Sequence, residues 1–248
     1  LLFGSQAKNS SLVRADGGEI TVTGAMEVGK GSDNVGIISY LSGKTILANG
    51  ATLGIIGGTN NSGVYVQNGG TFTNNGTIKA LAATSNGVIA ATKGVIINTG
   101  TIEKEKSGVA VVLAGGVFSS TGTITTGKGS AGLYTNINAS ANEVLLSGVG
   151  VIAENGGIAF YTGTSGEMKF KANNAGNTVA TIKNGGLAFY NVYVSNNGSA
   201  VGTYGKYDVS GPTNIKIENG GSAFGIKSSN PVSSDFTNYL TNVFGSSI

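Results

Sequence analysis

A short phrase ending in Gly-Thr-Ile recurs through the middle of the chain. Its copies lie at residues 74–78, 98–102 and 120–124, so they are 24 and 22 residues apart. Two further glycine-led phrases keep step with it, one beginning at Gly70, Gly94 and Gly116 and the other at Gly63, Gly87, Gly108 and Gly132. Three short strand-like phrases per repeat describe one coil of a β-solenoid. The spacing therefore predicts an all-β chain, a right-handed parallel β-helix with three short strands per coil.

The residues inside each phrase suit strands. Runs of three to five residues are rich in Val, Ile, Thr, Phe and Tyr, which are typical of strands. In a coil, alternate side chains point inward and stack on their copies in the next coil, about 4.8 Å away. We expect two internal ladders, one of Ile78, Ile102 and Ile124 and one of Phe72, Ile96 and Phe118.

Asn-Gly pairs mark the corners between strands. Such corners need a positive φ or a tight bend, and Gly and Asn adopt these conformations at the lowest cost. Turn chemistry therefore accounts for most of the pairs, and stacked Asn side chains can also hydrogen-bond from coil to coil. The pairs begin at Asn49, Asn68, Asn75, Asn86, Asn155, Asn184, Asn197 and Asn219.

The repeats indicate one solenoid segment over residues 1–248. Regular coils are expected over about 19–135, and coils with longer loops over about 140–230, where a block starting at Asn155 returns after 29 and then 35 residues. No signal peptide or membrane-spanning stretch is recognisable, and the first residues are already apolar. We therefore expect the segment to be part of a longer protein.

Three parts of the second half depart from the regular pattern. Long excursions are expected at about 164–176 and 192–213, and loops on a rigid scaffold are favourable places for specific binding. Near the end, apolar residues recur at helical spacing over 234–244, from Phe236 to Phe244. This spacing predicts one short amphipathic helix, with an irregular strand and loop as the alternative.

The composition excludes several classes of chemistry. The chain has no Cys and no His, so disulfides, thiol nucleophiles, a Ser-His-Asp triad and the commonest metal ligands are absent. Only 11% of its residues are charged and the formal net charge is +3, without a large cluster of Lys or Arg. We expect no nucleic-acid partner. The sequence contains no complete metal-binding or phosphate-binding motif, and it indicates no cofactor.

A carbohydrate-cleaving β-helix would need two or three carboxylates on one face of neighbouring coils. Glu103 and Glu105 are two residues apart and would share a face, but Lys104 and Lys106 alternate with them. This alternation is more typical of a solvated strand edge that discourages aggregation. The sequence therefore assigns no catalytic residue.

The tyrosines of the second half are the best candidates for binding. Sugar rings stack on Tyr, and carboxylates or amides hydrogen-bond their hydroxyls. Tyr161 and Tyr190 occupy equivalent positions, which favours a structural ladder inside the coils or on their surface. The longest excursion carries the other candidates, and the predicted ligand-binding residues are Tyr204, Lys206, Tyr207 and Asp208.

The repeat phrases resemble those of passenger domains of classical, type V autotransporters. The resemblance covers most of residues 19–227 and is closest to large fusobacterial outer-membrane autotransporter adhesins, with their Asn-Gly-Thr-Ile and Gly-Val-Ala-Val phrases. It implies a passenger that a C-terminal outer-membrane β-barrel of the same parent chain carries to the bacterial surface. It also implies binding to a glycan or protein receptor on host or bacterial cells.

Three functions remain open from the sequence. The first is a non-catalytic extracellular adhesin segment, anchored at the outer membrane or secreted. The second is a β-helix enzyme that acts on polysaccharide, for which the carboxylates offer little support. The third is a stalk that only sets a distance from the cell.

Overall fold

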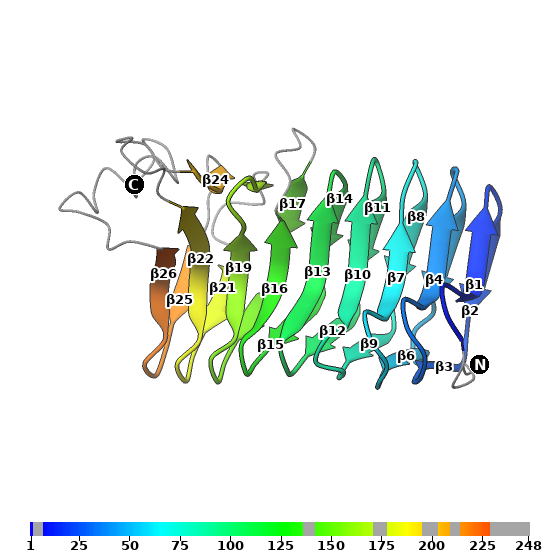
Figure 1. Cartoon of the computed structure of the whole chain (residues 1–248), viewed down its shortest axis with the longest axis horizontal. Coiled ribbons are helices and arrows are strands. Elements are labelled where there is room, and N and C mark those ends of the chain that lie inside the picture. Colours follow the sequence, from blue (N-terminus) through cyan, green and yellow to red (C-terminus); the bar gives the residue numbers. More distant parts are fainter. Residues whose placement is uncertain (2–6, 136–141, 171–177, 195–202, 209–213, 229–248) are drawn as a thin grey trace.

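The computed structural model describes residues 1, 7–135, 142–170, 178–194, 203–208 and 214–228. The described residues contain strands and no helix, and the strands form three sheets. Figure 1 shows the coils stacked side by side along the long axis of the molecule. The all-β solenoid with three short strands per coil is thus confirmed. The predicted helix at 234–244 lies outside the described residues.

Sheet 1 takes the first strand of each coil. Its order is β1 (Ser11–Asp16), β4 (Val35–Tyr40), β7 (Ser62–Val66), β10 (Asn86–Ala91), β13 (Gly108–Ala114), β16 (Ser130–Thr135), β19 (Ile158–Thr162), β22 (Leu187–Val194) and β23 (Thr203–Tyr204), and β26 (Ser222–Ser228) also pairs with β22. All these pairings are parallel except that of β22 with β23.

Sheets 2 and 3 take the second and third strands. Sheet 2 has the order β2 (Glu19–Val22), β5 (Lys44–Leu47), β8 (Thr71–Asn74), β11 (Val95–Asn98), β14 (Val117–Ser120), β17 (Glu143–Leu146), β20 (Glu167–Phe170) and β24 (Lys206–Asp208). Sheet 3 has β3 (Ala25–Val28), β6 (Thr52–Ile55), β9 (Thr77–Ala80), β12 (Thr101–Lys104), β15 (Thr123–Thr126), β18 (Gly150–Ala153), β21 (Thr178–Ile182) and β25 (Asn214–Ile217).

The coils are in the register that the repeats predict. Ile102 pairs with Ile78 on one side and Ile124 on the other, and Ile96 pairs in the same way with Phe72 and Phe118. All six side chains are fully buried. Both internal ladders are therefore confirmed, and the core is a column of like residues along the solenoid axis.

The structure extends the solenoid beyond the predicted regular region and into the predicted loops. Strand β1 precedes residue 19, β20 lies inside the expected excursion at 164–176, and β24 lies inside the one at 192–213. In β20, the buried Met168 and Phe170 alternate with the half-exposed Glu167 and Lys169, as in a strand with one face in the core. Gly166 and Gly205 precede β20 and β24, as Gly94 and Gly116 precede β11 and β14, but they are 39 residues apart instead of 22. The regular spacing alone therefore missed these strands.

The corners use glycine for two different reasons. At Asn155-Gly156, both residues have positive φ, of 53° and 82°, as the predicted turn chemistry requires. At Gly100 and Gly122, φ is ordinary, but a Cβ would lie 2.1 Å from the carbonyl oxygen of the glycine one coil earlier. Close stacking of main chain on main chain therefore excludes a side chain there.

A polar ladder runs inside the same corner. Asn74 Nδ2 donates to Asn98 Oδ1 at 2.7 Å, and Asn98 Nδ2 donates to Ser120 Oγ at 2.9 Å. All three residues are buried, so the hydrogen bonds compensate for the lost hydration of the side chains. Coil-to-coil Asn bonding is thus found as expected, although these are not the Asn residues of the Asn-Gly pairs.

Substitution of Gly100 tests the stacking of the corners. We expect Gly100→Ala to lower the free energy of unfolding by about 1–3 kcal/mol, because the new methyl group must push two coils apart. Gly24→Ala is the matched control, since a Cβ at Gly24 meets no atom within 4 Å and its φ is not positive. Urea denaturation followed by circular dichroism measures both. Equal stability of the two variants would contradict the stacking.

Candidate functional site

The four predicted binding residues do not form one surface site. Tyr204 belongs to β23, and the other three belong to β24 of sheet 2. Along β24, Lys206 is exposed and Asp208 half-exposed, whereas Tyr207 is only 2% exposed. Successive side chains of a strand point to opposite faces, so Tyr207 points into the core between two outward neighbours.

Tyr207 completes an aromatic cluster in the core. Its hydroxyl oxygen lies 2.6 Å from the carbonyl oxygen of Tyr190 and 3.0 Å from that of Phe160, and its single proton can be donated to either one. Its ring lies edge-on to Phe189, with the ring centroids 5.0 Å apart. This position corrects the expectation for Tyr207, because a buried ring offers no face to a sugar.

Substitution of Tyr207 is therefore expected to lower the stability of the fold, in contrast to substitution of its exposed neighbour Lys206. We expect Tyr207→Ala to lower the free energy of unfolding by about 3–5 kcal/mol. The substitution leaves a cavity in the packed core and removes the hydroxyl that two carbonyl groups share as a hydrogen-bond donor. The neighbouring Lys206→Ala should change stability by less than about 0.5 kcal/mol. Denaturant titration of both proteins tests this contrast. A Tyr207→Ala protein as stable as the parent would place the ring outside the core.

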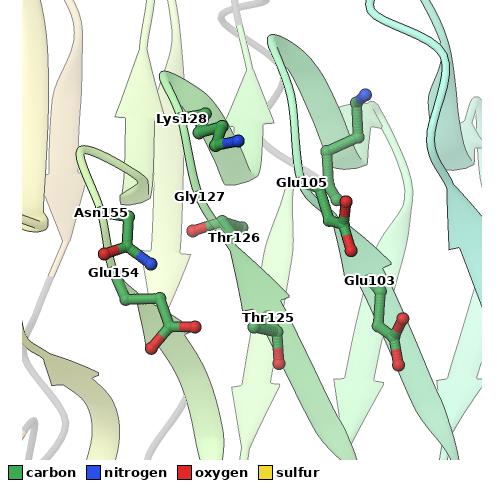
Figure 2. Close-up of a pocket in the computed structure, with 9 residues that line it drawn as sticks. Glu103, Glu105, Thr125, Thr126, Gly127, Lys128, Glu154 and Asn155 are labelled. Atoms are coloured by element: carbon green, nitrogen blue, oxygen red, sulfur yellow. The ribbon is translucent and has the colours of Figure 1, made fainter.

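A hollow of about 340 Å³ lies where three coils of sheet 3 meet their following turns. Figure 2 shows residues that line it. Gly127 lies at its centre, and a Cβ there would lie 3.4 Å from the carbonyl oxygen of Glu154 and 3.6 Å from that of Glu105, on the two adjacent coils. The lining residues are Glu103, Lys104, Glu105, Thr125, Thr126, Gly127, Lys128, Glu154 and Asn155.

Two carboxylates of the hollow have basic partners on adjacent coils. Glu103 lies 3.4 Å from Lys79 Nζ, and Glu154 lies 3.0 Å from Lys183 Nζ. Glu103 belongs to β12, which is inside sheet 3 and not at its edge, so the expected strand edge is in fact an outer sheet face. Lysine-paired, half-exposed carboxylates are ordinary surface ion pairs and are worth little energetically. They give the hollow no assigned reaction.

Lys104 is a fully buried lysine behind the hollow. Its position in the coil is occupied by Ala80 and Thr126 in the neighbouring coils. Its ammonium donates to the carbonyl oxygens of Ala80, at 3.1 Å, and Ala82, at 2.7 Å. Burial lowers the pKa of Lys104 to about 8, partly opposed by the charge of Glu105. Lys104 therefore holds the loop after β9 against the next coil.

The lowered pKa predicts how stability depends on pH. The folded protein releases the Lys104 proton near pH 8, whereas the unfolded chain releases it near pH 10.5, so unfolding takes up a proton between these values. We expect the free energy of unfolding to gain about 2 kcal/mol from Lys104 between pH 7.5 and 9.5. Lys104→Met should lack this gain in matched denaturant titrations. An identical pH dependence in both proteins would contradict the buried ammonium.

The outer face of sheet 1 differs from the rest of the surface. The seven strands β4, β7, β10, β13, β16, β19 and β22 contain no charged residue, whereas sheets 2 and 3 carry charges on many strands. One outward position of each strand is in register with the next and forms what we call the tyrosine row. The tyrosine row consists of Ile38, Tyr65, Ile89, Val112, Tyr134, Tyr161 and Tyr190.

Every member of the tyrosine row is half-exposed and apolar or aromatic. The centroids of Tyr134 and Tyr161 are 4.8 Å apart, and those of Tyr161 and Tyr190 are 5.1 Å apart. Partial burial raises the pKa of Tyr134 and of Tyr161. A contiguous apolar face of this kind is a feature of interaction surfaces. At the N-terminal end, the row is bordered by the ion pair of Arg14 with Asp16.

Sequence reasoning recognised only part of this surface. The equivalence of Tyr161 and Tyr190 indicated a ladder, but left open whether the ladder lies inside or outside the coils. The signal that could have found the face is the absence of Asp, Glu, Lys and Arg from the first phrase of seven successive coils. That absence matters only once the phrases are known to share one sheet.

Comparisons of the chain with protein families, with curated proteins and with solved structures found no significant match. Within the described residues, no helix has the length and apolar character needed to cross a membrane. The same residues contain no group of three or more acidic, His or Cys side chains arranged to hold a metal ion.

Proposed function

We propose that the chain is a non-catalytic binding rod, an adhesin segment of a bacterial surface protein of the autotransporter type. In this proposal a C-terminal outer-membrane β-barrel of the same parent chain delivers the rod to the cell surface, where it stays anchored or is released. The rod binds a receptor on host or bacterial cells, with a protein preferred to a glycan as the ligand.

The observation that supports this proposal most directly is the uncharged outer face of sheet 1. Surfaces that meet only water are usually rich in charge, whereas the central part of a binding interface is depleted of charge and enriched in Tyr. Seven neighbouring strands without a charged residue are therefore better suited to contact than to spacing alone. The continuous hydrogen-bond register supplies a rigid support in a chain that has no Cys for disulfides.

The geometry of the tyrosine row favours a protein ligand. A sugar chain stacks on flat ring faces that lie in one plane. Here the rings of Tyr134 and Tyr161 are inclined by 55° and those of Tyr161 and Tyr190 by 76°, so they present edges and hydroxyl groups as well as faces. Such a corrugated surface fits interdigitating side chains, as in protein interfaces.

A binding screen with face-specific variants tests the proposal. The labelled segment is added to host cells, bacterial cells and a glycan array. We expect Tyr161→Lys to weaken cell binding at least tenfold, because the contact would remove water from the new ammonium group. Thr125→Lys, at an outward position of sheet 3, is the matched control and should bind like the parent. Turnover of a polysaccharide by the segment would contradict an adhesin. So would a failure of the parent segment to bind any of the cells or glycans.

A further inference from the structure

The tyrosine row has the properties of a surface that matches a copy of itself. Its members follow one another at the spacing of the coils, about 4.8 Å, over seven strands. A partner with any other repeat distance would lose register with the ridges and grooves along this length. A second copy of the chain has the same repeat by construction, so all seven positions can interlock at once.

Charge also favours a second copy. A face without ionised side chains does not attract polyanions or charged membranes, and it does not repel an identical face. Two copies of sheet 2 or sheet 3 brought together would instead have to pair or bury charges such as Lys44 and Glu143, or Lys79 and Glu103. Within the described residues, sheet 1 alone has a long central region free of charged side chains. Two copies of that region can pack together without burying a charge.

We propose that sheet 1 of one copy packs face to face on sheet 1 of a second copy, with the two solenoid axes antiparallel. A two-fold axis along the strand direction at Val112 relates the copies. This inference rests on the proposed function, in which the same face is the contact surface, and it specifies the partner as the chain itself. Such a contact joins two cells, or two molecules on one cell, that display the same protein.

The antiparallel arrangement is favoured by the order of side chains along the tyrosine row. With the axis at Val112, Ile38 faces Tyr190 and Ile89 faces Tyr134, while Tyr65 faces Tyr161. Large rings are then shared evenly between both ends of the contact. In a parallel arrangement, the three successive tyrosines from Tyr134 to Tyr190 would face their own copies at one end only, so the two sheets would diverge.

The size of the face sets the strength of the contact. Seven strands at about 4.8 Å, each with about 15 Å of strand length, cover roughly 500 Å² per copy, or about 1,000 Å² in total. This is at the lower limit of specific protein interfaces, so the dimer should be weak, with a dissociation constant in the micromolar range or above. Many copies on a cell surface would act together and raise the overall affinity.

Cysteine cross-linking tests the arrangement, and the chain has no native Cys to interfere. Each variant is treated at micromolar concentration with a short bifunctional maleimide, because facing sheets lie about 10 Å apart, too far for a direct disulfide, and the products are examined by denaturing electrophoresis. We expect Val112→Cys to form a cross-linked dimer, and an equimolar mixture of Ile89→Cys and Tyr134→Cys to cross-link faster than either alone. Ile97→Cys is the control on sheet 2, where Ile97 is 38% exposed, and it should stay monomeric. Cross-linking of Val112→Cys no faster than the control would overturn the inference.

A charge exchange tests the same contact in solution without a covalent bond. Sedimentation velocity should show that Ile89→Lys and Tyr134→Glu each weaken self-association at least tenfold, and that mixing the two variants restores it. Restoration is expected only in the antiparallel arrangement, which places the new Lys beside the new Glu. Circular dichroism verifies that both variants are folded. Failure of the mixture to recover would overturn this arrangement.

The experiments separate the two proposals. If the parent segment stays monomeric at all concentrations but binds cells through the face altered by Tyr161→Lys, the second copy is the wrong partner and the binding function stands. If the segment neither self-associates nor binds cells, both proposals are wrong.

Discussion

Main-chain hydrogen bonds between successive coils are the constraint on which the structure depends. Apart from the antiparallel pairing of β22 with β23, they run in parallel through all three sheets, so each residue of the regular coils lies directly over its counterpart in the next coil. Every position must therefore tolerate its neighbours about 4.8 Å above and below. This accounts for the ladders of Ile and Phe in the core, and for the glycines at corners where main chain meets main chain.

The same constraint makes exceptions informative. Lys104 occupies a column position that Ala80 and Thr126 occupy in the adjacent coils. Its ammonium is accommodated because it reaches the carbonyl groups of Ala80, at the end of β9, and of Ala82 in the loop that follows. Tyr207 enters the aromatic core of the later coils and satisfies its hydroxyl in a similar way. In both residues the buried polar group has hydrogen-bond partners, so the stacking of successive coils is not disrupted.

The sequence predicted the fold well because the fold is periodic. The positions of Ile78, Ile102 and Ile124 follow from their spacing alone, and their pairing is as expected. Strands β20 and β24 were missed because Gly166 and Gly205, which precede them, do not follow the regular spacing of the repeats. Tyr207 was placed on a loop because its strand is only three residues long. The uncharged face of sheet 1 is assembled from separate phrases, so it becomes visible only when the register is known.

The binding role and the self-contact both require that this register extends along the whole rod. Pulsed electron spin resonance tests that requirement most directly, with pairs of spin labels on engineered cysteines in one outward column of sheet 3. Lys79, Thr125 and Thr181 belong to that column, with Glu103 and Ile152 between them. The account predicts that the mean distance rises by about 4.8 Å per coil, to roughly 19 Å between labels at Lys79 and Thr181. Distances that do not increase with the number of coils would contradict the solenoid and everything derived from it.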